Sequence, residues 1–392
     1  MLDSLKQQPA DALLALIKLY DADQRADKID LGVGVFRTET GATPVFAAVK
    51  EAEKRLVQAQ DSKAYLGPEG DLGFVHALIP HIFGSSGSLG GRIDGMQAPG
   101  GTGALRLAFA LAKRAGLRRL IVGSPTWPNH TQMFGDLGIE AVTFNHAGAD
   151  GAADMDALRA AVAAAQGGDA ILLHGCCHNP SGIDYTPDQW DEIAALVADK
   201  GLLPIVDLAY QGLGDGMDED AYGLRAIVAA VPEALICYSC DKNFGLYRDR
   251  VGALYVLGRD AETTARILTN GHNVARTTWS QPPDHGAAAA RIVLEDADLT
   301  KLWLDELAAM RSRMRTMREM LAAADNRVSG MDLVPLATQN GLFSILPLSK
   351  EQILTLREDH GVYMAGSGRI NVAGLTKANM ENFVSALAAV AG

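Results

Sequence analysis

YSCDKNFGLYRDRVG (residues 238–252) is the stretch that decides how this chain folds. It continues the apolar run ALIC, which reads as a buried strand, and it places Lys242 just beyond the end of that strand, with Arg250 eight residues later. A lone lysine normally lies on a solvated surface. At the end of a buried strand, before a glycine-containing loop and an arginine, a lysine suits instead a nucleophilic amine beside a phosphate site, because burial and nearby cations lower its pKa.

The middle of the chain repeats strands and helices. Continuous apolar runs of this kind fit strands that are buried on both faces of a mostly parallel sheet. Between two of them, residues 186–201 have the pattern of a helix, with Thr186 as the N-cap, Pro187 in the first turn and Gly201 at the end. This alternation predicts a doubly wound α/β layer structure. The runs are residues 119–125, 170–177, 203–210, 234–240 and 252–257.

After about residue 300 the pattern changes. KLWLDELAAMRSRMRTMREMLAAA (301–324) predicts one long helix, and short strands at LFSIL and RINVAG and a helix near 377–390 follow it. The helical segment near the start of the chain is expected to join this part. The sequence therefore predicts a smaller α+β domain beside a large, mostly parallel α/β domain. The expected boundaries are residues 1–10 for an N-terminal arm, 11–41 and 310–392 for the small domain, and 42–309 for the large domain.

Net charge and hydropathy indicate which classes of partner this protein can bind. The chain has 392 residues and a formal net charge of 35 minus 47, or −12, which argues against a nucleic-acid partner. A few arginines can still form a local site for an anionic small molecule. No apolar stretch approaches 18 residues, and no charged-then-apolar leader opens the chain, so we expect a soluble, cytoplasmic protein with no membrane partner.

The four cysteines fall in HGCCH (174–178) and CYSC (237–240). A zinc site or a redox motif are the functional alternatives, but the first segment lacks the C-x2-C ligand spacing and the second is one isolated pair. Both segments lie within or at the end of predicted core strands, where free cysteine is a common small apolar side chain. The pattern therefore predicts no metal site.

Polar residues follow the predicted strands at the point where each strand ends. In open α/β sheets, ligands bind beyond the carboxyl ends of the strands, so these residues are expected to share one site. Polar residues distributed at random along the chain would not gather at the ends of the predicted strands. The residues are His174, Asn179, Asp207, Tyr210, Ser239 and Lys242.

Five further segments carry candidate chemistry, each with a purely structural alternative. PGGTG (99–103) opens an apolar helix and could bind a phosphate through backbone N–H groups, or be a tight turn. Trp127, in SPTWPNH, could stack on a planar ring, or simply pack in its loop. Asn179 could donate to a phenolate oxygen, or form a turn. Asp207 needs a cationic or protonated partner if it is buried, unless it caps a loop. Arg369, in AGSGRINVAG, could grip a carboxylate, or lie on the surface.

Taken together and in this order, PGGTGALR, PTWPNH, HGCCHNPSG, DLAYQG and KNFGLYRDRVG resemble the fold-type I aminotransferases, and most closely the aspartate and aromatic-amino-acid subgroup. The resemblance runs from LGVGVFR near the start of the chain to SGRINVAG near its end. It implies pyridoxal 5′-phosphate as the cofactor, amino acids and 2-oxo acids as small-molecule substrates, and a homodimer with shared active sites.

The resemblance also implies residue roles. Lys242 matches the lysine that forms a Schiff base with the cofactor and shuttles a proton. Asp207 matches the partner of the ring nitrogen, and His130 its support. Tyr210 and Asn179 match the groups that contact the phenolate oxygen, and Trp127 the residue that stacks on the ring. Trp127 and Asn179 are also expected to line the substrate site. The phosphate cradle corresponds to Gly101, Thr102, Ser239 and Arg250, with Tyr65 reaching it from the neighbouring subunit.

Two arginines and a glycine match substrate-binding residues of the family. Arg369 corresponds to the residue that binds the α-carboxylate, Arg276 to the one that binds a side-chain carboxylate across the dimer interface, and Gly34 to a segment that closes over the substrate. Some positions depart from the family pattern. Asp241 stands where a serine usually precedes the lysine, and Trp279 and Gln281 stand where tyrosine and asparagine are usual. Phe36 and Ser181 also differ, and Gln281 and Ala64 lie near positions that tune substrate size.

The resulting prediction is ping-pong transamination between aspartate, an aromatic amino acid or both, and 2-oxoglutarate, which yields the oxo acid and glutamate. Three alternatives remain at this point. One is a pyridoxal-phosphate β-decarboxylase or lyase on the same fold. The second is an aminotransferase-like regulatory binding module. Such a module would require an N-terminal helix-turn-helix and a basic patch, and the sequence shows neither. The third is a nicotinamide-dependent oxidoreductase, whose glycine and acid fingerprint is missing here.

Overall fold

The computed structural model describes residues 2–7, 12–84 and 89–391. The predicted arm, residues 1–10, lies partly outside these ranges. The chain divides into two compact units, one made of residues 1–43 and 313–392 and the other of residues 44–312. We call them the small unit and the large unit, and each is described by itself.

A seven-stranded sheet forms the centre of the large unit, with the order β2-β8-β7-β6-β5-β3-β4. All neighbours pair in parallel except β8, which runs antiparallel to both β2 and β7. The predicted α/β fold with a mostly parallel sheet is therefore confirmed. The strands are β2 (Ile93–Pro99), β3 (Arg119–Ser124), β4 (Glu140–Asn145), β5 (Ala170–His174), β6 (Leu203–Leu208), β7 (Ala234–Ser239) and β8 (Val251–Leu257).

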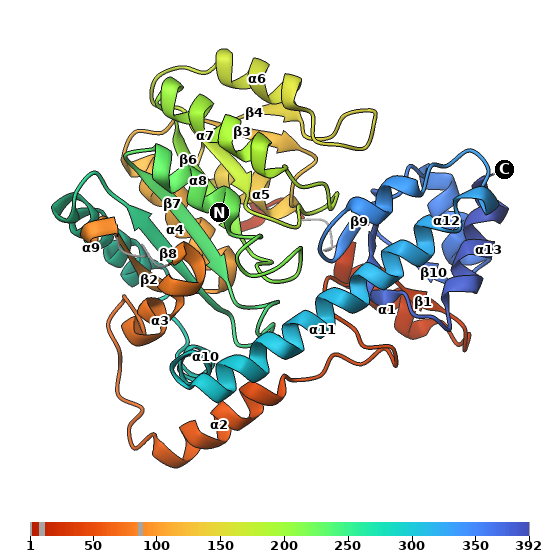
Figure 1. The fold of residues 1–392 in the computed structure, drawn as a ribbon, viewed down its shortest axis with the longest axis horizontal. Helices are drawn as coiled ribbons and strands as arrows, with labels where there is room; N and C mark the ends of the chain where they lie inside the picture. The colour runs from red at the N-terminus through yellow and green to blue at the C-terminus, as the bar shows by residue number, and fades with distance from the viewer. Residues whose placement is uncertain (1, 8–11, 85–88, 392) are drawn as a thin grey trace. The chain divides into compact units, whose positions relative to one another are not determined.

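Helices pack on both faces of this sheet (Figure 1). One core joins α4 (Gly100–Arg114), α5 (Pro128–Asp136) and α9 (Ala261–Thr278) to side chains from six of the strands. α6 (Met155–Ala163), α7 (Pro187–Lys200) and α8 (Tyr222–Ala230) pack in series beside one another. α2 (Ala47–Ala59), α3 (Leu72–Phe83), α10 (His285–Glu295) and the first part of α11 (Ala297–Ala322) complete the unit.

The helix predicted at residues 186–201 forms for the expected reasons. The Thr186 hydroxyl oxygen accepts a hydrogen bond from the backbone N–H of Gln189, and the backbone N–H of Thr186 donates one to Oε1 of the Gln189 side chain. Gly201 ends the helix with a φ of 67°, in the left-handed region that glycine enters without strain. The apolar positions Trp190, Ile193, Ala194 and Val197 are all buried.

The small unit contains two short two-stranded sheets. β1 (Ile29–Asp30) pairs in parallel with β10 (Val362–Tyr363), and β9 (Phe343–Ile345) pairs antiparallel with β11 (Arg369–Asn371). Side chains from β1, β10 and β11 pack with the second part of α11, α12 (Lys350–Glu358) and α13 (Met380–Ala391) around one apolar core. The helix α1 (Ala12–Ala22) belongs to the same unit. Strands and helices thus occur together, as the α+β pattern predicted.

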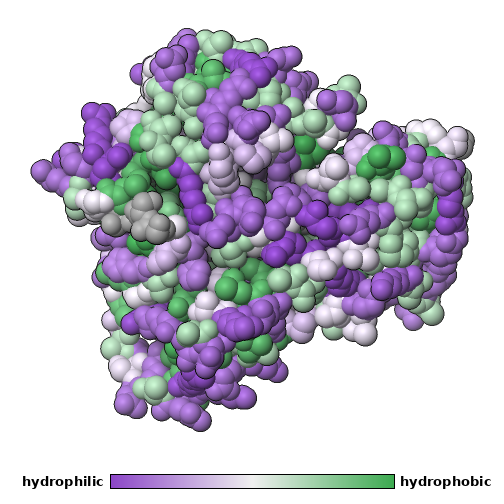
Figure 2. Space-filling view, viewed as in Figure 1, coloured by the Kyte–Doolittle hydropathy of each residue, from purple (hydrophilic) through white to green (hydrophobic). Residues whose placement is uncertain are grey.

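Hydrophilic residues predominate on the face shown in Figure 2, and apolar residues form small groups among them. Within the described ranges, none of the helices combines the length and the apolar character that a membrane span requires.

Candidate functional site

The order and direction of the strands bring the candidate residues to one edge of the large sheet. In the β5–β6 pairing His174 lies opposite Asp207, at or next to the carboxyl end of each strand. Ser239 ends β7, and Gly252 of β8 lies opposite it. Because β8 runs antiparallel, Arg250 at its beginning reaches the same edge as the ends of its parallel neighbours. Sequence reasoning predicted this clustering from the strand ends.

Lys242 lies two residues beyond Cys240 in the loop that follows β7, and it is half-buried. Its Nζ atom is 5.0 Å from the centre of the Tyr210 ring. Burial lowers the pKa of the Lys242 amine, and the positive charge of Arg250 lowers it further, while Asp241 and Asp207 act in the opposite direction. The net shift is downward, which favours the neutral, nucleophilic amine.

Asp207 is a buried carboxylate, and only one of its two oxygens has a hydrogen-bond partner. Its Oδ2 accepts a hydrogen bond from Nε2 of His130 at 3.0 Å, and its Oδ1 is buried without a hydrogen-bond partner. Burial alone would raise the pKa of this carboxyl group, but the hydrogen bond from His130 and the surrounding positive potential hold the pKa below its usual value. An ionised oxygen facing no donor is costly, so Oδ1 is suited to receive a hydrogen bond from a bound ligand.

A network of buried side chains continues behind Asp207. The Thr126 hydroxyl lies 2.8 Å from Nδ1 of His130 and 3.0 Å from Nε2 of His174. One hydroxyl proton cannot serve two acceptor nitrogens, so one of the two imidazoles donates to Thr126. The carboxylate of Asp207 can only accept, so His130 Nε2 is the donor in their contact. Sequence reasoning predicted His130 but missed Thr126, whose only signal was its place in the same loop.

Four imidazoles stand in a row from this network, and we call them the histidine row: His130, His174, His178 and His146. Successive ring centres are 5.1, 4.3 and 3.6 Å apart, and the last two rings are stacked with an angle of 7° between them. Burial lowers the pKa of His174 to about 3 and that of His146 to about 4, and it holds the pKa of His178 well below its usual value. These three imidazoles are therefore neutral at pH 7.

The histidine row predicts that the protein loses stability in mild acid. An imidazole whose pKa is lowered on folding binds its proton more readily in the unfolded chain, so stability falls as the pH drops below 6.5 toward about 4. Each such histidine contributes roughly 1.4 kcal/mol per pH unit over this range. Asp220, whose pKa burial raises to about 6, acts in the opposite direction and offsets part of the loss.

Urea unfolding between pH 7 and pH 5 measures this effect. We expect the His146→Phe variant to show a slope smaller by about one proton than that of the unchanged chain. His76→Gln, which removes an exposed imidazole, is the matched control with which the His146→Phe slope is compared. An equal slope for His146→Phe and the unchanged chain would contradict the assignment of a neutral, buried His146.

The start of α4 forms a cradle of backbone next to Ser239 and Arg250. Gly100 has a φ of 68°, and a Cβ there would lie 2.6 Å from the guanidinium of Arg250. A Cβ on Gly101 would lie 3.0 Å from the Cβ of Ser239. Pro99 precedes the helix and has no side-chain group that could bond to its first turn. The N–H groups of the first turn, which includes Gly101 and Thr102, therefore remain available for an anion.

Three further predicted residues surround this edge. Trp127 is the N-cap of α5 and is partly buried, with its ring edge-on to that of His130 at 5.3 Å. Asn179 is buried and is joined to Pro180 by a cis peptide bond, in the loop after β5. Tyr210 is buried just after β6. Aromatic side chains, an amide, the first turn of α4 and the Lys242 amine thus lie near one edge of the sheet.

The remaining predicted residues lie elsewhere. Tyr65 is 93% exposed between α2 and α3, and Arg276 is exposed in the last turn of α9. Arg369 and Gly34 belong to the small unit. The guanidinium of Arg369 lies 4.3 Å from the ring centre of Phe343 and donates to the carbonyl of Gly32 at 3.3 Å, and a Cβ on Gly34 would lie 2.7 Å from the same ring.

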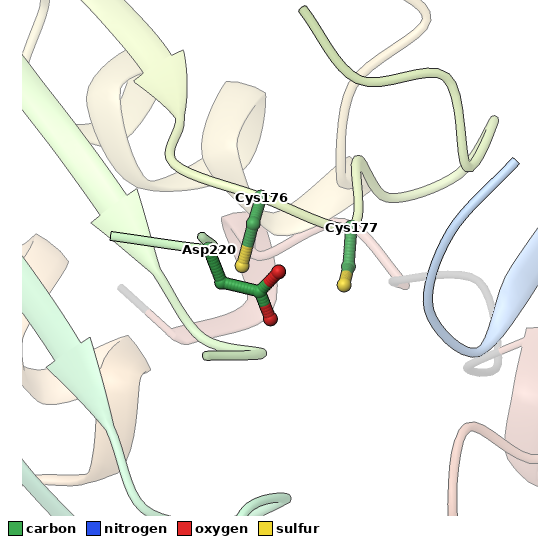
Figure 3. A group of neighbouring side chains, drawn as sticks. All are labelled: Cys176, Cys177 and Asp220. Atoms are coloured by element: carbon green, nitrogen blue, oxygen red, sulfur yellow. The ribbon is translucent and has the colours of Figure 1, made fainter. Parts of the chain in front are cut away.

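Cys176, Cys177 and Asp220 are close enough to suggest a metal site (Figure 3). The structure argues against that use. The carboxylate of Asp220 already accepts backbone N–H bonds from Gly212, Gly214 and Asp215 at 2.8–2.9 Å. Burial raises the pKa of the Cys176 thiol well above its usual value, which disfavours the thiolate that a metal needs. The cluster instead holds the loop after β6 in place.

Comparison with known proteins adds independent findings. A family model described as aminotransferase class I and II matches residues 26–387. The tyrosine aminotransferase of Rhizobium meliloti (strain 1021) is 49% identical over 96% of this chain and 97% of its own length. The aspartate aminotransferase of Salmonella typhi is 42% identical over the full length of both chains. A solved aromatic-amino-acid aminotransferase from Burkholderia pseudomallei, covalently bound to pyridoxal phosphate, aligns over both full chains with a TM-score of 0.96 and 34% identity.

Proposed function

The chain belongs to the class I and II aminotransferases, and from that premise we propose which of its residues bind the cofactor, which bind the substrate and which move the proton. The chain is an aminotransferase that depends on pyridoxal 5′-phosphate. Bound in the site, this cofactor supplies an aldehyde that accepts amino groups and a ring that stores the electrons of the substrate's α-carbon. The roles below rest on the geometry of the large unit and on the family pattern.

One observation carries the placement of the cofactor: the buried Oδ1 of Asp207 has no hydrogen-bond partner, on the strand next to the one that leads to Lys242. A protonated ring nitrogen would satisfy that oxygen. Ser239, Arg250 and the first turn of α4, with Gly101 and Thr102, would then hold the phosphate. The side chains available for the ring itself are Trp127 for stacking, and Asn179 and Tyr210 for the phenolate oxygen.

We propose that Lys242 is both the point of covalent attachment and the proton carrier. Its lowered pKa favours a neutral amine once the substrate has displaced it, and that amine would take the α-proton and return it to a carbon atom of the cofactor. The ionised Asp207, held by His130, keeps the ring nitrogen protonated. Arg369 would bind the substrate α-carboxylate through two parallel hydrogen bonds, and Gly34 would belong to the segment that covers the substrate.

The proposed substrates are aspartate, aromatic amino acids or both, with 2-oxoglutarate as the acceptor. The aromatic, tyrosine and aspartate aminotransferases among the relatives favour this range. A panel of aspartate, tyrosine, phenylalanine and tryptophan with 2-oxoglutarate tests it, with each product oxo acid quantified. Release of CO2 from aspartate without formation of glutamate would instead indicate β-decarboxylation.

We further propose that the protein works as a cytoplasmic homodimer. Tyr65 and Arg276 match residues that serve the active site of the neighbouring subunit, and both are exposed on the single chain. Val57 is also 73% exposed, on the helix that precedes the Tyr65 loop. A second subunit over this region would bury side chains that a single chain leaves in water. Sedimentation equilibrium of the holoenzyme measures the dimer directly.

Arg276→Ala should separate the two substrate classes. Loss of a cation that pairs with the distal carboxylate lowers kcat/KM for aspartate by about 10²- to 10³-fold. Phenylalanine lacks that carboxylate, so its kcat/KM changes by less than about threefold. Arg266→Ala, which removes another exposed cation from α9, is the matched control and spares both substrates. Equal losses on aspartate and phenylalanine would refute the role of Arg276.

The same variant tests the shared active site. When Arg276→Ala chains are mixed with Lys242→Ala chains, a hybrid dimer has one site with both original residues and one site with neither. Aspartate activity should therefore reappear in the mixture, although each parent lacks it. A mixture no more active than its parents would show that Arg276 serves the site of its own chain.

A further inference from the structure

Asp241 places a negative charge inside the anion cradle. The Asp241 side chain is 6% exposed, and its Oδ2 accepts a hydrogen bond from Nη1 of Arg250 at 2.5 Å. The Asp241 N–H donates to the hydroxyl of Ser239 at 3.2 Å. Two of the four residues assigned to the phosphate, Ser239 and Arg250, thus already form hydrogen bonds with Asp241. The position of this carboxylate could not be inferred from the sequence.

The geometry at Gly100 shows how close Asp241 lies to the start of α4. A Cβ on Gly100 would meet the guanidinium of Arg250 at 2.6 Å and Oδ2 of Asp241 at 3.0 Å. The first turn of α4, Arg250 and Asp241 therefore enclose one small space. The other oxygen of Asp241, Oδ1, is buried without a hydrogen-bond partner. A carboxylate in such a place favours cations, whereas the helix N-terminus and the arginine favour anions.

The charges in the cradle nearly cancel. Arg250 contributes one positive charge, Asp241 one negative charge, and the start of α4 about half a positive charge. The half-buried Lys242 lies in the same loop, and Asp241, Asp207 and Arg250 all act electrostatically on its amine. A phosphate with about two negative charges must therefore share Arg250 with a carboxylate that repels it.

On this basis, and resting on the proposed function, we propose that Asp241 competes with the cofactor phosphate for Arg250 and makes cofactor binding weak and exchangeable. Weak phosphate binding matters in the half of the catalytic cycle in which no covalent bond holds the cofactor. While the cofactor is attached to Lys242, a covalent bond keeps it in the site. Once it carries the amino group, as pyridoxamine 5′-phosphate, only non-covalent contacts retain it. The enzyme then releases its cofactor when an amino donor is present and no oxo acid is available to take the amino group back.

Equilibrium binding of pyridoxamine 5′-phosphate to the cofactor-free protein tests the proposal without an activity assay. By isothermal titration calorimetry, Asp241→Ser should bind it at least about tenfold more tightly than the unchanged chain, since a close charge pair is worth that much or more. Asp241→Asn, which keeps the shape and removes the charge, should show the same gain. Pyridoxamine without its phosphate should bind all three proteins equally.

Asp249→Ser is the matched control, because it removes a carboxylate from the same loop and leaves the Asp241–Arg250 pair in place. Its affinity should stay within about twofold of the unchanged chain. A second measurement follows cofactor retention: dialysis against glutamate without an oxo acid should strip the unchanged holoenzyme at least about tenfold faster than Asp241→Ser.

The outcomes separate this inference from the proposed function. If Asp241→Ser binds pyridoxamine 5′-phosphate equally well or more weakly, Asp241 orients Arg250 rather than competing with the phosphate, and the inference fails while the cofactor site stands. An equal gain for pyridoxamine without phosphate would also overturn it, because the effect would not then act through the anion cradle. If none of the proteins binds either compound, the cofactor site itself is wrong.

Discussion

Lys242→Ala should lower kcat for transamination by at least about 10⁴-fold, the largest effect expected of any single change in this chain. Two functions disappear with one amine, namely covalent attachment of the cofactor and transfer of the α-proton. The Tyr210 ring that Lys242 faces offers no amine that could replace it. Steady-state kinetics with the best donor of the panel and 2-oxoglutarate measures the loss.

Absorbance gives a second, independent reading. The unchanged holoenzyme should absorb between roughly 330 and 430 nm, and Lys242→Ala should lose the part of that spectrum that depends on the covalent link. Lys242→Arg keeps a positive charge and cannot form the link, so it should be as inactive as the alanine variant. Lys54→Ala, on the exposed face of α2, should be fully active. Full turnover by Lys242→Ala would remove the basis of the whole assignment.

Much of the site was predictable because ligands of open α/β sheets bind beyond the carboxyl ends of the strands. The buried strands β5, β6 and β7 are short apolar runs, and the polar residues at or just after their carboxyl ends are the ones that meet at one edge. Two strands of the large sheet, β2 and β4, were not predicted in this way. β2 reads IDGMQAP, and its polar Gln97 is buried because its side chain bonds to Asp71 and Pro283. β4 is an edge strand, mostly exposed, so it lacks the continuous apolar run.

The charge relations within the site could not be derived from sequence. His146 comes from the loop after β4 and stacks on His178 from the loop after β5, a contact that depends on the packing of distant segments. Asp241 follows a strand like many loop residues, and only the antiparallel return of β8 brings Arg250 to it. Residue types predicted which groups gather, whereas pairing and burial decide which of them are charged.

Asp207→Asn should lower kcat by about 10³- to 10⁴-fold while the protein still binds its cofactor. The amide keeps the size of the side chain and removes the charge that holds the ring nitrogen protonated, so the ring can no longer store the electrons released with the α-proton. The phosphate cradle is built from other residues, so equilibrium binding of pyridoxamine 5′-phosphate should weaken by less than about tenfold. A loss mainly in KM would contradict this role.

Asp207→Glu separates the charge of this residue from its position. The longer side chain keeps the charge but displaces it from His130 and from the ring nitrogen, so kcat should fall less than in Asp207→Asn, by about 10-fold to 100-fold. A higher kcat for Asp207→Glu than for Asp207→Asn would then show that the charge matters more than its placement. The lowered pKa of Asp207 also predicts that the unchanged enzyme keeps this carboxylate ionised well below pH 5. An acid-side loss of kcat above pH 5 must therefore come from another group, and the same loss in Asp207→Asn would prove it.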